Sequence, residues 1–212
     1  MQRREKRFEI ACPKCGVSFE KDLPTAIFAD KPERNEILEG KFGEMTCPEC
    51  GRAFILNYRF AYTDESKSFM IINDPDFIDK KARLAFSTSL GLIGLDRKNE
   101  LYKHRLRITY DYPSLKEKIL IFEKGLDDRV IELMKYFLVH SDDFAYKVEQ
   151  IKSFYYGADN KFYLETALNV GASLDFSQTL YDTIVNNYGE IIKKDLNHLI
   201  DRFWAEEFLR AK

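Results

Sequence analysis

The sequence predicts an α+β protein, in which an N-terminal zinc ribbon (β-hairpins with one inserted short helix) is followed by a mixed α+β domain. One observation is a duplicated Cys-Pro-x-Cys-Gly motif, flanked by short stretches in which polar and apolar residues alternate. The other is a C-terminal part in which helical periodicity and strand-turn-strand patterns are interspersed. We expect the ribbon domain to span residues 1–72 and the α+β domain to span residues 73–212.

The duplicated motif contains every cysteine of the chain: Cys12, Cys15, Cys47 and Cys50. In each copy the two-residue spacer lets both sulfurs point at one ion. The proline fixes φ after the first ligand, and the glycine permits the positive φ that closes the turn. Zinc prefers tetrahedral sulfur, and four thiolates leave no coordination position open for water or substrate. The motif therefore predicts one structural Zn²⁺ ion bound by these four cysteines.

Two other uses of paired cysteines stay open at this point. A redox enzyme of the thioredoxin type also carries Cys-x-x-Cys, but it needs one copy, whereas this chain has two, each followed by glycine. Structural disulfides need an oxidising compartment, and no apolar stretch of signal-peptide length follows the basic residues 1–7. The longest weakly polar stretch, residues 84–95, is too short to span a bilayer. We therefore expect a cytoplasmic protein with no membrane partner.

In the ribbon half, alternation predicts a strand at residues 8–10 and a returning strand at 17–20, joined through the first motif. Residues 32–40 have the signals of a short helix, with proline in the first turn and glycine at the stop. A strand over 54–60 is expected to pair with residues 69–72.

The C-terminal half is expected to alternate helices and strands. Its predicted elements are a partly buried helix over 84–95, a strand at 106–110, helices beginning at 113 and 127, a hairpin over 152–168, and helices over 180–192 and 196–208. Asp127 and Asp128 allow two interpretations, a catalytic carboxylate pair or a helix cap. The cap is favoured, because acids in a first turn oppose the helix dipole.

The sequence lacks the common catalytic and nucleotide-binding motifs. His104, His140 and His198 are far apart and fit no ligand pattern, and neither a phosphate-binding Gly-x-x-x-x-Gly-Lys loop nor a Gly-x-Ser-x-Gly elbow occurs. All four cysteines are committed to the metal. We therefore predict no catalytic residue and no cofactor besides zinc.

The pattern around both motifs resembles the CpXC domain, which is named for its two Cys-Pro-x-Cys motifs. Besides the motifs, the resemblance rests on Phe8 and Ile10, Thr46, residues 62–64 and 69–71, and more loosely residues 117–119 and 126–132. Members of this family are typically prokaryotic and functionally uncharacterised. The resemblance implies that the four cysteines form a zinc set, and it implies no activity.

Three functional hypotheses follow from the sequence. The leading one is a ribbon that acts as a protein-interaction module, because residues 1–72 carry 12 basic and 12 acidic side chains and form no basic stripe. The alternative is a nucleic-acid-associated protein that uses the ribbon loops and the basic N-terminal tail. A third is an enzyme whose charged groups are Asp127, Asp128 and Arg129.

Overall fold

The computed structural model describes residues 4–78, 105–168 and 171–211. Within these ranges it contains five α-helices and eleven strands in four small sheets, which confirms the predicted α+β class. The chain divides into two compact units, residues 1–116 and residues 117–212. The helix expected over 84–95 and His104 lie outside the described residues.

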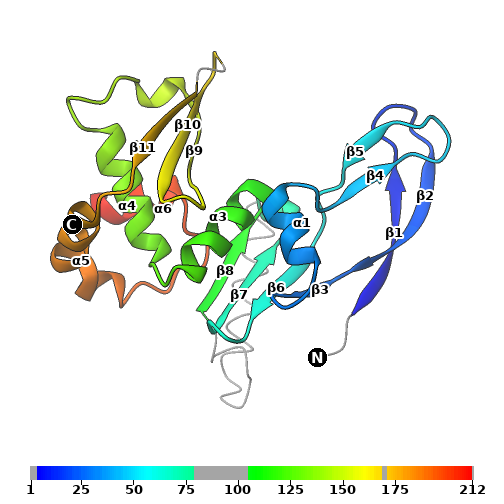
Figure 1. Cartoon of the computed structure of the whole chain (residues 1–212), viewed down its shortest axis with the longest axis horizontal. Helices are drawn as coiled ribbons and strands as arrows, with labels where there is room; N and C mark the ends of the chain where they lie inside the picture. The colour runs from blue at the N-terminus through cyan, green and yellow to red at the C-terminus, as the bar shows by residue number, and fades with distance from the viewer. Residues whose placement is uncertain (1–3, 79–104, 169–170, 212) are drawn as a thin grey trace. The chain divides into compact units, whose positions relative to one another are not determined.

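Two β-hairpins carry the cysteine motifs in the first unit. Strands β1 (Glu5–Ala11) and β2 (Ser18–Pro24) pair antiparallel, and the first motif forms the turn between them (Figure 1). Strands β4 (Glu44–Thr46) and β5 (Ala53–Ile55) pair in the same way around the second motif. The structure thus confirms the predicted strand, motif and returning strand of the N-terminal hairpin.

A four-stranded sheet is the largest sheet in the described part of the first unit. Its order is β3 (Ala26–Phe28), β6 (Phe60–Asp64), β7 (Phe69–Asn73) and β8 (Arg105–Thr109). The central pair β6–β7 is antiparallel, whereas β3 and β8 join the two sides as parallel strands. Tyr62, Phe69 and Ile71 are almost fully buried in this sheet. A short 3₁₀ turn at Pro75–Ile78 follows β7.

The predicted short helix is α1 (Glu33–Glu39), between β3 and β4. Pro32 stands at its N-cap, and Gly40 ends it with a φ of 75°. The Gly40 N–H bonds to the carbonyls of the last turn, which is the usual use of a left-handed glycine at a helix end. Ile37 is the buried residue of this helix.

The strand predicted over residues 54–60 is wrong as one element, because the structure has two strands, β5 and β6, separated by residues 56–59. Backbone carbonyls of this separating segment accept hydrogen bonds from side chains rather than from a neighbouring strand. The Leu56 carbonyl accepts from the Tyr112 hydroxyl at 2.6 Å, and the Tyr58 carbonyl accepts from the Asn73 side chain at 2.8 Å. Apolar alternation continues through the segment because Tyr58 packs into an aromatic cluster with Phe42 and Phe60, at centroid distances of 5.9 and 5.2 Å.

The sheet extends beyond the boundary that the sequence suggests after residue 72. Strand β8 pairs in parallel register with β7, from Phe69 opposite Arg105 to Asn73 opposite Thr109. The first compact unit consequently reaches residue 116. Independent folding of residues 1–72 stays a prediction.

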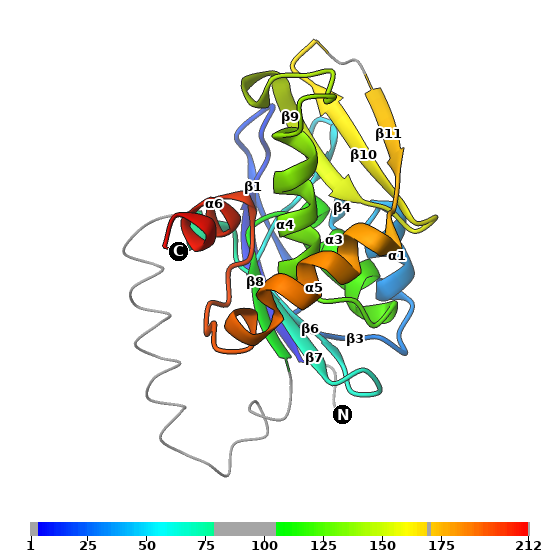
Figure 2. The ribbon, with the colours of Figure 1, turned by 90° about the vertical axis from the view of Figure 1, so that its left-hand side faces the viewer.

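Helices and a three-stranded antiparallel sheet make up the described part of the other unit. Helix α3 (Tyr112–Glu123) runs across the division between the units, and Gly125 follows its end with a φ of 73°. The remaining elements are α4 (Asp128–Val139), a 3₁₀ turn at Val148–Gln150, β9 (Ile151–Tyr156), β10 (Lys161–Thr166), β11 (Gly171–Asp175), α5 (Gln178–Ile192) and α6 (Arg202–Arg210). Helix α4 packs against both α5 and α6 (Figure 2).

Two details of the second unit differ from the sequence prediction. Strand β11 was not predicted; it extends the expected β9–β10 hairpin into a three-stranded sheet. The last helix was expected to begin near residue 196 but begins at Arg202, where the Asp201 side chain accepts from the Trp204 N–H as an N-cap. Asp195 meanwhile closes a turn by accepting from the Asn197 N–H, so this segment has polar partners that compete with a helix.

Candidate metal centre

The two cysteine turns have the same backbone geometry. In the first, the Gly16 N–H donates to the Cys12 carbonyl at 2.9 Å, and in the second, the Gly51 N–H donates to the Cys47 carbonyl at 3.1 Å. Both glycines have positive φ, 74° for Gly16 and 67° for Gly51. Only glycine adopts this conformation without strain, so each motif folds into the closed turn that its sequence predicts.

The four sulfurs converge between the two turns. All four Sγ atoms lie within 4.8 Å of one another. Cys12 Sγ is 3.8 Å from Cys50 Sγ, and Cys15 Sγ is 3.7 Å from Cys47 Sγ. A tetrahedral Zn²⁺ site with Zn–S bonds of about 2.3 Å has sulfur–sulfur edges of about 3.8 Å. The structure therefore brings together all four residues that the sequence singles out, at separations that fit one tetrahedral ion.

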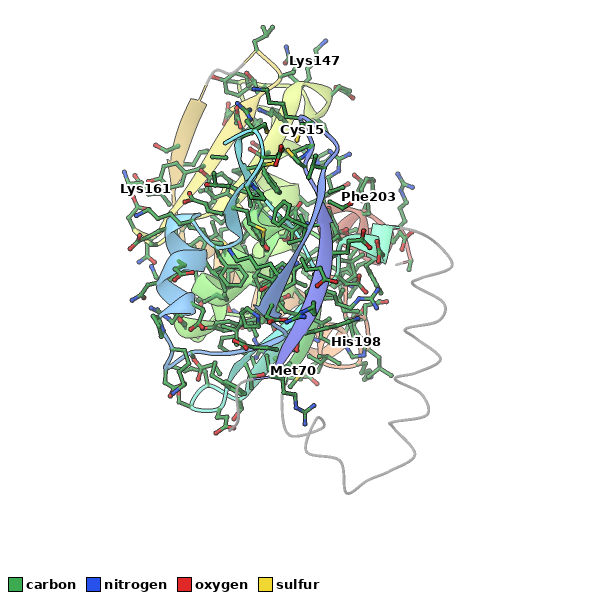
Figure 3. The ribbon with its side chains drawn as sticks, turned by 90° about the vertical axis from the view of Figure 1, so that its right-hand side faces the viewer. Cys15, Met70, Lys147, Lys161, His198 and Phe203 are labelled. Atoms are coloured by element: carbon green, nitrogen blue, oxygen red, sulfur yellow. The ribbon has the colours of Figure 1, made fainter. Side chains whose placement is uncertain are left out.

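These distances also bear on the disulfide alternative. The four cysteines are free thiols, and the two measured sulfur separations are almost twice the length of a disulfide bond, about 2.05 Å. Each of the two close pairs joins one buried residue to a more accessible one, because Cys12 and Cys47 are buried, Cys15 is exposed and Cys50 is intermediate. Figure 3 shows Cys15 at the end of the β1–β2 hairpin.

Among the four closely spaced thiols, the pKa values of Cys12 and Cys15 are shifted in opposite directions. The backbone N–H groups of Cys15 and Lys14 lower the pKa of Cys12 to about 6, although loss of hydration opposes this change. The Val17 N–H favours the Cys15 thiolate, but loss of hydration and the three neighbouring sulfurs raise the pKa of Cys15 to about 12. Thiolates this close repel one another, and a divalent cation at their centre removes the conflict, because metal ligation deprotonates thiols.

The sequence also singles out Asp127, Asp128 and Arg129, and in the second unit these residues form hydrogen bonds and ion pairs. Asp127 is the N-cap of α4, as predicted, and its carboxylate accepts from the Arg129 N–H at 3.0 Å. The Arg129 guanidinium binds the same carboxylate and donates to the Ile192 carbonyl at 2.6 Å, at the end of α5. Asp128 is fully buried and lies 3.1 Å from Lys118 Nζ.

The two described histidines belong to the second unit and are not members of the four-cysteine group. His140 is at the C-terminal cap of α4, where its ring stacks on Tyr136 at 4.0 Å and its Nδ1 lies 2.8 Å from the Tyr136 carbonyl. His198 lies in the segment between α5 and α6. Among the described residues, we find one group of three or more histidine, cysteine, aspartate or glutamate side chains whose ligand atoms are close enough to hold one ion. That group is the four cysteines.

A group that the sequence did not predict is a buried set of five charged residues on α3 and α4, which we call the charge cluster: Glu117, Lys118, Asp128, Glu132 and Lys135. The available signal was spacing. Asp128, Glu132 and Lys135 follow one another by four and three positions, so they share one face of the helix. Such a stripe usually faces water, which is why sequence reasoning passes over it.

The fold and the cysteine cluster define the class of protein: an α+β protein in which two cysteine turns on paired hairpins could hold a metal ion. Comparison with known sequences agrees, because the model of the CpXC protein family matches residues 10–135. The chain belongs to the CpXC family, which confirms the resemblance seen in the sequence. No curated protein and no solved structure matches the chain. Within the described residues no helix has both the length and the apolar character needed to cross a membrane.

Proposed function

We propose that the four cysteines bind one structural Zn²⁺ ion, and that the metal-stabilised hairpins form a protein-interaction module. The observation that carries the metal proposal is the pair of sulfur–sulfur separations, 3.8 and 3.7 Å, which fit the edges of a tetrahedral zinc–thiolate site. A closed set of four thiolates leaves the ion no position for a substrate, so its role is to hold the hairpins together.

The metal is identified by element analysis of the purified protein together with its absorption spectrum. One zinc per chain and no visible colour are expected. Iron also accepts tetrahedral sulfur, and iron in the same stoichiometry with a coloured spectrum would replace zinc in the proposal. Protein that contains no metal and has paired disulfides would overturn it. Cys47→Ser should lower the metal content, whereas Ser18→Ala, a change beside the first turn, should not.

The compartment follows from the same chemistry. Free thiolates persist where the thiol pool is reducing, so we place the protein in the cytoplasm. Fractionation of cells that express the full chain tests this assignment. Recovery from an oxidising compartment, with the cysteines paired, would contradict it.

Two observations support an interaction role for the hairpins. Val17 directly follows the first cysteine turn and Ile55 is the last residue of β5, and these large apolar side chains remain 38% and 54% exposed. The charges of residues 1–72 balance, which favours neither a polyanion nor a polycation as the partner. Apolar side chains exposed on metal-stabilised hairpins fit another protein better than they fit a phosphate backbone.

The interaction role is tested by capture from native lysate. The double substitution Val17→Ser, Ile55→Ser should abolish capture of the partner while the metal content stays at one ion per chain. Leu168→Ser is the matched control, because Leu168 is 82% exposed but lies in the second unit. A partner retained by the double variant, or lost with the control, would contradict the proposal.

The nucleic-acid alternative is decided by titration at physiological salt. With balanced charge in residues 1–72, generic DNA and RNA should bind weakly and without a preferred length. Submicromolar affinity that falls steeply as salt increases would replace the interaction module by a nucleic-acid-associated role.

A further inference from the structure

The three-stranded sheet of the second unit has two edges of different character. Its order is β11–β10–β9, so β9 and β11 are its edge strands among the described residues. Buried side chains occupy the edge of β9. The Tyr156 N–H donates to Glu117 at 2.7 Å, and the Phe154 carbonyl accepts from Lys135 at 3.2 Å. Figure 2 shows β11 as the outer strand on the other side of the sheet.

Alternate residues of β11 direct their backbone groups away from β10. Directly after the strand, the Phe176 N–H donates to the Asn160 carbonyl at 3.0 Å. Since the N–H and C=O groups of successive residues in a strand point to opposite sides, and the register with β10 is unbroken, the outward-facing residues are Gly171, Ser173 and Asp175. All three are exposed. Their backbone groups can therefore pair with a further strand.

The edge of β11 lacks most of the features that prevent strand pairing. Natural edge strands are protected by lysine, proline, bulges or a covering segment. Strand β11, with the sequence Gly-Ala-Ser-Leu-Asp, contains neither lysine nor proline. The irregularity of this sheet lies between Glu165 and Thr166, where β10 pairs with β9. The one charge of β11 is Asp175, at its end, which is 86% exposed and lies 3.3 Å from Lys161.

A second copy of β11 fits this edge along its whole length. A two-fold axis through Ser173 would pair the two strands antiparallel over all five residues, with the outward-facing backbone groups of each copy opposite those of the other. Gly171 then lies opposite Asp175 of the second copy. The two Asp175 side chains lie at opposite ends of the paired strands, so like charges are not placed opposite each other.

The same register continues the apolar face of the sheet. Within one chain, Ala172 lies opposite Leu164, and Leu174 lies opposite Phe162. Leu164 and Phe162 are buried, whereas Ala172 and Leu174 at the edge are only half-buried. An axis through Ser173 places Ala172 opposite Leu174 of the second copy. Pairing would thus cover the half-buried apolar side chains of each edge with those of the other.

We propose that β11 is a self-association site, through which two copies of the chain form one six-stranded antiparallel sheet. The partner is a second copy because the strand complements itself in both charge and apolar pattern. A pair of five-residue strands is smaller than a standard interface of about 1,600 Å². The dimer should therefore be reversible and dissociate on dilution.

Sedimentation of the purified, metal-loaded full chain over a wide range of concentration tests the dimer. The mass should rise from that of one chain, 25.0 kDa, to that of two and no further. Ser173→Pro removes an outward-facing N–H at the centre of the edge, a position where a strand tolerates proline. The change breaks two hydrogen bonds of the dimer, one from each copy, so the dissociation constant should rise at least about tenfold. Ser173→Ala keeps the N–H and should dimerise like the parent.

Charge at Gly171 tests the register. A Cβ at Gly171 would lie 4.0 Å from its nearest neighbour, so a side chain fits there. Gly171→Lys places an ammonium opposite Asp175 of the second copy and should strengthen the dimer, whereas Gly171→Glu should weaken it. Asn187, exposed on α5, is the matched control, because its Lys and Glu variants change the net charge equally and should leave the dimer unchanged.

Two measurements separate loss of the dimer from other defects. Trp204, the only tryptophan in the chain, is buried in the second unit, so its fluorescence reports whether each variant folds there. The double variant Val17→Ser, Ile55→Ser should dimerise like the parent, because both residues belong to the first unit. The dimer can therefore be tested independently of the interaction role proposed for the hairpins.

Several outcomes would overturn the proposal. A mass that stays at one chain at every concentration excludes a second copy. If Ser173→Pro then loses a partner captured from lysate, the occupant of the edge is a strand of another protein. A dimer that Ser173→Pro leaves unchanged uses another surface, and a mass that grows beyond two chains excludes a closed two-fold pair. Shifts of the same sign in the two Gly171 variants contradict the register.

Discussion

The cysteine turns and the charge cluster are two ways of placing charged groups at the centre of a small structure. In the turns, four cysteine sulfurs lie within 4.8 Å of one another. In the charge cluster, two lysines supply the opposite charge from within the chain. The first arrangement requires an external ion to offset its charge, whereas the second contains cationic side chains of its own.

The two regions also differ in how much apolar surface is buried around them. Strands β1 and β2 are mostly exposed along their length, and the buried residues near them are few, such as Ile10 and Leu23. Helix α4, by contrast, buries Val130, Ile131, Leu133 and Met134 in addition to its charged residues. A segment with little apolar burial depends on its crosslink for stability, because small structures bury too little surface to offset chain entropy.

The largest effect should come from removing a metal ligand. Cys47→Ser should disorder residues 8–72 while α4 stays folded, because metal binding provides folding free energy on the order of 10 kcal/mol in small zinc structures. Hydrogen exchange resolves the two regions in one experiment, with protection expected to fall in β1, β2, β4 and β5 and to persist in α4. Ala53→Ser, beside the second turn, should preserve both.

Two results would break the comparison. Protection that survives in the hairpins of Cys47→Ser would mean that the metal is not structural. Protection lost throughout the chain would mean that residues 8–72 and the second unit fold as one cooperative domain, and the predicted division after residue 72 would then be wrong.

The second largest effect should come from the charge cluster. Lys118→Met removes the ammonium that lies 3.1 Å from the fully buried Asp128 carboxylate, and breaking a buried pair from one side costs about 3–5 kcal/mol. The fluorescence of Trp204 in urea measures the loss. Lys152→Met removes the cation of the exposed pair with Glu165 and should cost less than about 1 kcal/mol. Equal losses in the two variants would show that burial does not distinguish these pairs.

The sequence predicts local features well because their causes are local. The cysteine turns, the end of α1 at Gly40 and the Asp127 cap all depend on a few adjacent residues, and the structure has each of them. The break between β5 and β6 depends on Tyr112, more than fifty positions away, whose hydroxyl binds the Leu56 carbonyl. The charge cluster was missed for a similar reason, since burial of its stripe on α4 depends on packing against α3 and β9 rather than on the stripe itself.

The smallest expected effect is a difference in stability between alanine variants of two glycines that have almost the same backbone conformation. Gly43 has a φ of 80°, and a Cβ added there would lie 2.5 Å from the Leu56 carbonyl oxygen and 2.9 Å from the Tyr112 hydroxyl. Gly40 has a φ of 75° and open space around it. Both alanine variants incur the strain of positive φ, about 1 kcal/mol, but Gly43→Ala must also displace the Tyr112–Leu56 hydrogen bond and should lose about 1–3 kcal/mol more.

The difference in stability between the two alanine variants measures how strongly the contact between Gly43 and Leu56 restrains the first unit. Thermal unfolding followed by far-UV circular dichroism, with metal bound to both variants, compares them directly, and Gly43→Ala should unfold at the lower temperature. Hydrogen exchange should then increase around residues 56–59 in Gly43→Ala and around the end of α1 in Gly40→Ala. If the two variants lose equal stability, the contact between Gly43 and Leu56 does not restrain the segment between β5 and β6. Loss of the metal from Gly43→Ala alone would instead show that this contact supports the second cysteine turn, because Gly43 immediately precedes β4.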